Sequence, residues 1–271
     1  MIAQDFDYVC RLVRDRSGIV LEAGKEYLVD ARLTPVARRC QLGSIAELVC
    51  RLRADPGGEL VTRVVEAMVT SETSFFRDLH PFETLRTTVL PDLFRRRAGE
   101  KQLNVWCAAC STGQEPYSLA ILLREHFRDM AGWRVNILAT DLSGEVLARA
   151  RAGQYSQVEV NRGLPATLMV KYFRQCGSTW ELSTEVRRMV EFREMNLLRP
   201  WPPLPRMDLV FLRNVMIYFD TAAKKLILGQ VARLLRPDGY LLLGGAETTL
   251  NLDDSLRRSE HLKGGFYQLV R

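Results

Sequence analysis

Two acidic residues follow apolar segments, at positions where carboxylates could bind a ligand. Glu115 lies in the turn that follows Leu103–Cys107, and Asp141 comes straight after Val135–Thr140. If both segments are parallel strands of one sheet, their carboxyl ends meet at the edge where open α/β sheets bind ligands. A carboxylate there can hold a cation or accept hydrogen bonds from ribose hydroxyls. The spacing therefore predicts a nucleoside-binding site.

The turn itself, residues 108–116, narrows the ligand class. It contains one glycine, Gly113, so neither GxGxxG nor GxxxxGK[ST] is present. Glu115 would occupy the helix start that phosphate-binding proteins leave open, and its charge would repel a phosphate. S-adenosylmethionine carries an ammonium and a sulfonium, so it fits better. Glu115 could instead complement only the helix dipole, and Asp141 could be a helix cap, in competition with Ser143.

Cysteine chemistry and metal binding are not expected. Cys107 and Cys110 form a CxxC pair, but no second pair and no histidine cluster completes four zinc ligands. We expect both sulfurs to pack beside the turn, and we expect no metal.

Strands that alternate with helices position this turn. Apolar strands are expected at 103–107, 135–140, 207–212, 240–243 and 266–270, with helices at 116–126, 145–152 and 221–235 between them. This order indicates an α/β fold with a doubly wound, mostly parallel, Rossmann-like sheet over residues 91–271. The stretch from about 154 to 190 interrupts the rhythm and is expected to form a small β insertion.

The first ninety residues lack strand-like alternation and show helical spacing. We therefore expect residues 1–90 to form an all-α N-terminal domain, with one helix interrupted or kinked at Pro35. Between Ala31 and Ala54 the only acid is Glu47, against a group of five arginines: Arg32, Arg38, Arg39, Arg51 and Arg53. This group predicts a basic docking surface, although a charge run is also typical of a solvated helix face.

Composition and charge limit the classes of partner. Apolar residues make up 47% and charged residues 26%, which is typical of a globular protein. The net charge of +6 lies after residue 90 and accompanies no nucleic-acid recognition motif, so no nucleic-acid partner is expected. No apolar run is long enough to cross a bilayer, and residues 1–7 have no features of a secretory signal. We therefore expect a cytoplasmic protein that does not insert into a membrane. We also expect a monomer.

Four separated segments resemble one family in order and spacing. They are residues 71–77 (SETSFFR), 109–118 (ACSTGQEPYS), 139–141 (ATD) and 213–219 (RNVMIYF). With them the chain resembles CheR, the family of chemotaxis-receptor glutamate methyltransferases, over nearly its whole length. The resemblance implies transfer of a methyl group from S-adenosylmethionine to receptor glutamates, leaving S-adenosylhomocysteine.

The resemblance also implies roles for individual residues. Thr73 and Arg77 would lie over the cofactor, and Glu115 would bind its ammonium. Asp141 would hold the ribose. The remaining implied contacts are Asn196 and Leu197 at the adenine, Asn214 and Val215 near the methionine portion, and Tyr218 close to the transferred methyl group. Ser71 stands where the family usually has asparagine, which puts that cofactor contact in question.

The implied reaction needs no general base, because a glutamate is already ionised at neutral pH. His80, His126 and His261 accordingly fall outside the four segments. Arg77 is the candidate for orienting a carboxylate, and Tyr218 could donate a hydrogen bond nearby. The arginine group would dock the cytoplasmic helical domain of methyl-accepting receptors. The short 175–184 loop favours action without a receptor tether peptide.

Other functions remain open at this point. The chain could methylate a different carboxylic acid or an RNA, and RNA would predict strongly salt-dependent binding. It could also be a non-catalytic receptor scaffold that binds S-adenosylmethionine. Methyl label that base releases as methanol would identify a carboxyl ester.

Overall fold

The computed structural model describes residues 2–127 and 132–270, and the chain divides into two compact units. The first unit contains residues 1–70 and 218–223, and the second contains residues 71–217 and 224–271. The division falls earlier than the expected boundary near residue 90. The reason is that Phe82, Leu85 and Leu93 are buried in one hydrophobic cluster with strand residues such as Val105. Residues 71–90 therefore belong to the sheet unit.

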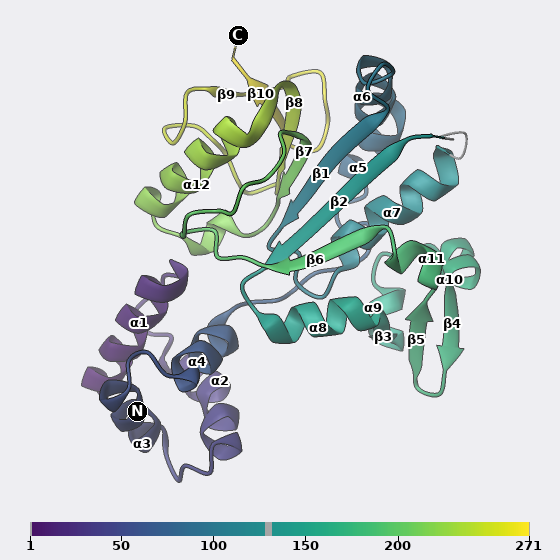
Figure 1. Ribbon diagram of the computed structural model, residues 1–271. Helices are drawn as coiled ribbons and strands as arrows, with labels where there is room; N and C mark the ends of the chain where they lie inside the picture. Colours follow the sequence, from purple (N-terminus) through teal and green to yellow (C-terminus); the bar gives the residue numbers. More distant parts are fainter. Residues whose placement is uncertain (1, 128–131, 271) are drawn as a thin grey trace. The chain divides into compact units, whose positions relative to one another are not determined.

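The first unit is built from four helices, drawn in purple to blue in Figure 1. They are α1 (Ala3–Ser17), α2 (Glu26–Arg39), α3 (Ile45–Ala54) and α4 (Glu59–Met68). Apolar residues at helical spacing, such as Val9 and Val13 of α1, are fully buried. Helix α2 runs through Pro35, so of the two expected outcomes the interruption is wrong and the kink stays a prediction. Residues 218–223 join this unit through a bridge between Ile19 and Phe219.

The second unit is organised around a seven-stranded sheet of order β6-β2-β1-β7-β8-β10-β9 (Figure 1). The strands are β1 (Gln102–Ala108), β2 (Arg134–Asp141), β6 (Val190–Glu194), β7 (Met207–Leu212), β8 (Leu235–Leu243), β9 (Leu256–Arg258) and β10 (Phe266–Leu269). The strands β6, β2, β1, β7 and β8 pair in parallel, whereas β9 and β10 are antiparallel. This confirms the doubly wound, mostly parallel sheet.

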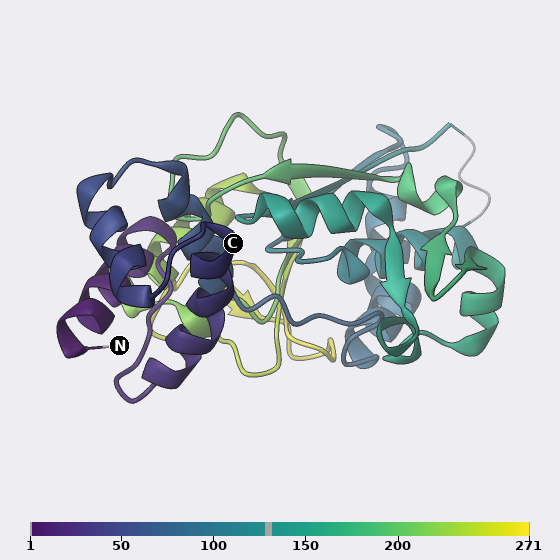
Figure 2. The same cartoon turned by 90° about the horizontal axis from the view of Figure 1, so that it is seen from below.

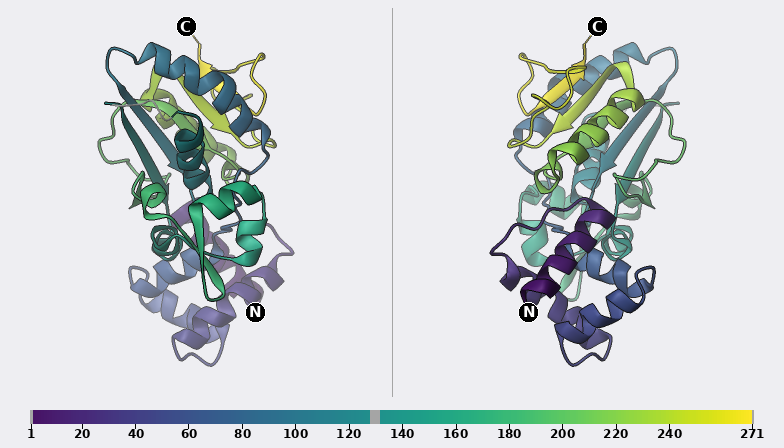
Figure 3. Two further views of the ribbon diagram at one scale, coloured as in Figure 1. Left: turned by 90° about the vertical axis from the view of Figure 1, so that its right-hand side faces the viewer. Right: turned by 90° about the vertical axis from the view of Figure 1, so that its left-hand side faces the viewer.

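Helices lie on both faces of this sheet. They are α5 (His80–Thr84), the π-helix η1 (Leu85–Val89), α6 (Leu90–Arg96), α7 (Gln114–His126), α8 (Gly144–Ala152) and α12 (Thr221–Leu234), with the short 3-10 helix η2 (Met216–Tyr218). Strand order proceeds from β1 in one direction to β2 and β6, and from β7 in the other direction to β8. Right-handed crossovers therefore place α7 and α8 on one face and α12 on the other (Figure 3).

The predicted β insertion is present as a three-stranded antiparallel sheet of order β3-β5-β4. It comprises β3 (Gln154–Ser156), β4 (Phe173–Cys176) and β5 (Thr179–Leu182), with α9 (Gln157–Asn161), α10 (Ala166–Tyr172) and α11 (Thr184–Arg187). The chain then returns to the main sheet as β6, alongside which α8 runs in Figure 2. The sequence pattern missed β6 and β9, because both are short and carry several charged residues.

One further expectation needs correction. A strand was expected only at 240–243, but β8 already begins at Leu235. Leu235 pairs with Met207 and Tyr240 with Leu209, so the intervening residues bulge out of the pairing.

Candidate functional site

The turn between β1 and α7 has an unusual backbone. Ala109, Ser111 and Gly113 all have positive φ, at 54°, 51° and 92°. For alanine and serine this conformation is unfavourable by about 1–3 kcal/mol, so the surroundings must hold it. The N–H of Cys110 donates to the Thr140 carbonyl oxygen at 2.9 Å, which ties the turn to the end of β2. The strain is concentrated where the sequence predicted ligand binding.

Gly113 has a packing role in addition to its positive φ. A Cβ atom at this position would lie 3.0 Å from Cβ of Ala150 and 3.1 Å from Cε2 of Tyr117. Both contacts are tighter than normal carbon packing allows. The glycine therefore lets α7 approach α8 closely, while the neighbouring Ala109–Ser111 backbone forms the strained part of the turn.

Asp141 connects the turn to β2. Its carboxylate accepts hydrogen bonds from the N–H of Ser111 at 2.8 Å and from the N–H of Ser143 at 3.1 Å. Ser143 caps α8 by accepting from the N–H of Val146, so the cap is the serine and not the aspartate. The Asp141 carbonyl oxygen accepts from the N–H of Met195, which brings Asn196 and Leu197 to the same edge. Asp141 thus joins the turn, the start of α8 and the segment after β6.

Glu115 forms a buried ion pair with Arg213. Oε2 of Glu115 lies 2.9 Å from Nη1 of Arg213, whose side chain is 1% exposed. Burial raises the pKa of Glu115 above its ordinary value of 4.5, and the nearby guanidinium opposes that shift. Among the residues that the structure describes, Oε1 of Glu115 has no partner. One oxygen of this carboxylate therefore remains able to bind a cation.

Arg213 also holds the segment before α5. Its Nη2 donates to the carbonyl oxygen of Arg77 at 3.0 Å and to Oδ2 of Asp78 at 2.8 Å. Sequence reasoning quoted Arg213 in a motif but gave it no role. An arginine directly after the apolar run Leu209–Leu212 was the available signal, because such a residue is buried only when its charge is paired.

The 71–77 segment packs onto the start of α7. The Ser71 carbonyl oxygen accepts from Oγ of Ser111 at 2.7 Å, and the N–H of Phe76 donates to Oγ of Ser118 at 2.9 Å. Phe75 and Phe76 are buried core residues. The half-buried Arg77 donates to the Glu72 carbonyl oxygen at 3.1 Å, and Thr73 is half-buried beside it. The side chain of Ser71 is exposed, so only its backbone contributes here.

Glu247 holds the loop after β7 and was missed by the sequence pattern. Its carboxylate accepts from four backbone N–H groups, at distances between 2.7 and 2.9 Å, which belong to Asn214, Val215, Met216 and Gly244. Asn214 has a φ of 57°. A single carboxylate thus fixes the strained loop that carries the two predicted methionine-side residues.

Tyr218 and the arginine group belong to the first unit. The Tyr218 carbonyl oxygen accepts from the N–H of Val20 at 2.9 Å. Arg32 donates to the Met68 carbonyl oxygen at 2.6 Å, and Arg53 pairs with Asp5 at 3.0 Å, so both arginines have internal contacts. The other three arginines of the group are exposed and form no ion pair in the described part of the chain: Arg38, Arg39 and Arg51.

Both cysteines of the CxxC pair are buried free thiols. Burial raises the pKa of Cys107 and of Cys110 well above the ordinary value, which keeps both protonated. Residues 2–127 and 132–270 contain no cluster of three or more side chains suited to a metal ion. Within the same residues, no helix has the length and apolar composition that crossing a membrane requires.

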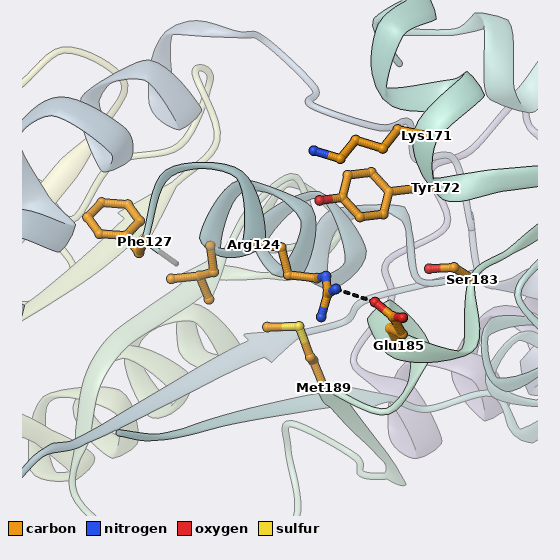
Figure 4. A pocket seen from close by; sticks show the side chains of 8 residues that line it. Arg124, Phe127, Lys171, Tyr172, Ser183, Glu185 and Met189 are labelled. Carbon is orange, nitrogen blue, oxygen red and sulfur yellow. Dashed lines mark hydrogen bonds and ion pairs between the residues drawn. The ribbon is translucent and has the colours of Figure 1, made fainter. Parts of the chain in front are cut away.

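The second unit also contains a pocket of about 670 Å³ beside the β insertion (Figure 4). Leu123, Phe127 and Met189 form its apolar lining, and its cations are already paired. Arg124 pairs with Glu185, and Lys171 pairs with Glu125 at 2.5 Å. This pocket contains none of the predicted site residues.

Comparison with known proteins places the chain in a family. Residues 4–69 match the family model described as CheR methyltransferase, all-alpha domain. Residues 71–263 match the model described as CheR methyltransferase, SAM binding domain. The chain belongs to the CheR methyltransferase family. It is an S-adenosylmethionine-dependent methyltransferase of chemotaxis, as the sequence resemblance implied.

Curated relatives match over nearly their full length. Chemotaxis protein methyltransferase Cher2 of Pseudomonas putida is 39% identical over 97% of both chains. Chemotaxis protein methyltransferase 1 of Pseudomonas aeruginosa is 40% identical over the same shares. Chemotaxis protein methyltransferase 1 of Vibrio cholerae is 36% identical over 98% of this chain and 97% of the relative.

Proposed function

We propose that this methyltransferase acts on glutamate side chains in the cytoplasmic helical domain of chemotaxis receptors, as a cytoplasmic monomer. When bound, S-adenosylmethionine supplies a methyl group on a positively charged sulfur, which a carboxylate can accept to form a methyl ester and leave S-adenosylhomocysteine. The observation that carries the proposal is the buried Glu115, which keeps one oxygen for a cation at the edge of a sheet in a CheR-family chain.

The donor set of the site fits this cofactor. Glu115 offers a carboxylate oxygen for an ammonium, and Asp141 offers acceptors for ribose hydroxyls. The segment after β6 carries Asn196 and Leu197 to the same edge, where they would border an adenine. Asn214 and Val215, which Glu247 holds in place, would line the methionine side. These assignments combine the observed positions with the family resemblance.

The protein's contribution to the reaction would be orientation and exclusion of water. An ionised glutamate is already a nucleophile at neutral pH, so no general base is required. Arg77, on the segment that Arg213 holds, would orient the cofactor or the acceptor carboxylate, and Thr73 would lie over the cofactor. Tyr218 would donate a hydrogen bond near the transferred methyl group. Placement of the reacting atoms in line can lower the barrier by several kcal/mol, about 7–11 in favourable cases.

Methyl transfer from labelled S-adenosylmethionine to purified receptor fragments tests the proposal. We expect label that base releases as methanol, and we expect glutamine at the acceptor positions to abolish it. Arg77→Ala and Tyr218→Phe should both lower kcat, with thermal unfolding as the folding control. Label that resists base, label on RNA, or full turnover by both variants would contradict it.

A further inference from the structure

The second unit has a pocket of about 440 Å³ next to the Glu115–Arg213 pair. Arg213, Asn214 and Asp78 contribute to its wall, and these residues also belong to the site described above. The opposite wall comes from the ends of β8 and β9 and from the loop before β10. Its further lining residues include three basic side chains: His80, Arg258 and Lys263.

The acidic residues of this pocket already have partners. Asp78 pairs with Arg213 at 2.8 Å, and Glu247 accepts its four backbone N–H bonds. An arriving cation would have to displace one of these partners. The acids therefore offer little to a positively charged ligand.

The basic residues of the pocket are in the opposite situation. Neither Arg258 nor Lys263 forms an ion pair or a side-chain hydrogen bond with any residue in 2–127 or 132–270. In the pocket of Figure 4, by contrast, Arg124 and Lys171 are both paired with glutamates. Two cations without a carboxylate partner, Arg258 and Lys263, give their side of the 440 Å³ pocket a positive potential, and such a concave site attracts anions.

The wall that carries Lys263 is rigidly packed. Gly264 and Gly265 have φ values of 105° and 84°, and a Cβ on Gly264 would lie 2.9 Å from Cα of Pro81. The N–H of Leu243 donates to the Gly265 carbonyl oxygen at 3.0 Å, which joins the loop to β8. The backbone of this wall therefore loses little conformational freedom when the pocket binds a ligand.

We propose that this pocket binds an acidic side chain of the acceptor protein, one that neighbours the glutamate to be methylated. The inference rests on the proposed function. Because the pocket shares Asn214 and Arg213 with the site, a carboxylate bound there would lie beside the reacting centre. Arg258 and Lys263 would then select acceptors in which the methylated glutamate has a second acid close by.

The double variant Arg258→Gln/Lys263→Gln tests this inference in the full chain. We expect the KM for an acceptor fragment with a neighbouring acid to rise about tenfold, which corresponds to about 1.4 kcal/mol. The kcat and the Kd for S-adenosylhomocysteine should stay unchanged. Arg257→Gln is the matched control, because Arg257 precedes Arg258 on β9, where successive side chains point to opposite faces, and it does not line the pocket.

The acceptor side provides a second measurement. Replacing the neighbouring acid by glutamine should raise the KM of the wild type to the same extent and should have no further effect on the double variant. An unchanged KM in the double variant, an equal rise with Arg257→Gln, or a weakened affinity for S-adenosylhomocysteine would each overturn the inference. Failure of the wild type to methylate any receptor fragment would instead contradict the proposed function.

Discussion

The two ends of the main sheet both carry buried ion pairs, but they differ in how completely those charges are satisfied. At the amino end, Arg97 pairs with Asp208 at 2.6 Å and with both carboxylate oxygens of Asp238. At the carboxyl end, Glu115 pairs with Arg213 through one oxygen only.

The two ends also differ in backbone conformation. Ala109, Ser111 and Asn214 have positive φ at the carboxyl end, whereas at the amino end Lys101, directly before β1, has a positive φ. At the amino end, Asp208 also accepts from the N–H of Asn104 in β1, which ties two strands together. A saturated network is typical of structural stabilisation, whereas strain combined with an open acceptor is typical of a ligand site.

The largest expected effect comes from breaking the amino-end network. Arg97→Leu would leave Asp208, which is 0% exposed, with Arg236 as its remaining cationic partner, whose Nε lies 3.5 Å from Oδ1 of Asp208. Removing one partner of a buried ion pair destabilises a protein by up to about 3–5 kcal/mol, and Arg236 offsets part of that loss. Urea unfolding should show this loss, while the affinity for S-adenosylhomocysteine should not change.

Arg95→Leu is the matched control, because the Arg95 side chain is 77% exposed and pairs only with the nearby Asp92. It should cost no more than about 1 kcal/mol. Equal losses for the two variants would remove the structural role assigned to the amino-end network.

The next effect is expected from the loop that Glu247 holds. Glu247→Gln places an amide NH2 where backbone N–H groups now donate, so some of the four bonds must be lost. We expect a loss of about 1–3 kcal/mol in stability. Because the loop carries Asn214 and Val215, the affinity for S-adenosylhomocysteine should also fall about tenfold, as measured by calorimetry. Stability loss with full affinity would show that the loop does not shape the cofactor site.

The open oxygen of Glu115 predicts a pH dependence at the carboxyl end. Burial raises the pKa of Glu115 above 4.5, so the free protein takes up a proton here at a higher pH than an exposed glutamate does. A cationic ligand favours the ionised form. The affinity for S-adenosylhomocysteine should therefore be full above the raised pKa and should fall as the pH drops through it.

Glu115→Gln should bind more weakly at neutral pH and should lose this dependence, and calorimetry over a pH series measures both. Because Asp78 still pairs with Arg213 in that variant, its folding can be checked independently by thermal unfolding. An unchanged pH dependence in Glu115→Gln would assign the titration to another group.

The smallest effect concerns the first unit. Reversing the three exposed arginines, Arg38, Arg39 and Arg51, to glutamate should raise the KM for receptor fragments several-fold at low salt. Exposed charge pairs contribute about 0.2–1 kcal/mol each, and salt screens them. Arg63→Glu on α4 serves as a control for general charge. A KM that stays constant at low salt would exclude this docking surface.

The sequence predicted those parts of the molecule that depend on local patterns. Two apolar runs identified strands and their carboxyl ends: one precedes the turn with Glu115, and the other precedes Asp141. This was possible because side-chain periodicity and strand termini are local properties. The first and last residues of the strand Met207–Leu212 were predicted correctly for the same reason. Short charged strands such as Val190–Glu194 were not predicted, since only pairing with β2 makes them strands.

Composition, periodicity and the four family segments thus determined the fold class, the methyltransferase family and the edge of the sheet that carries the site. Tertiary structure alone decided which partners these residues find. Arg213 meets Glu115 across 98 positions, and Glu247 meets Val215 across 32. The gathering of His80, Arg258 and Lys263 around one pocket likewise depends on chain folding. Such pairings follow from which strand ends become neighbours in the sheet, and residue spacing along the chain does not contain that information.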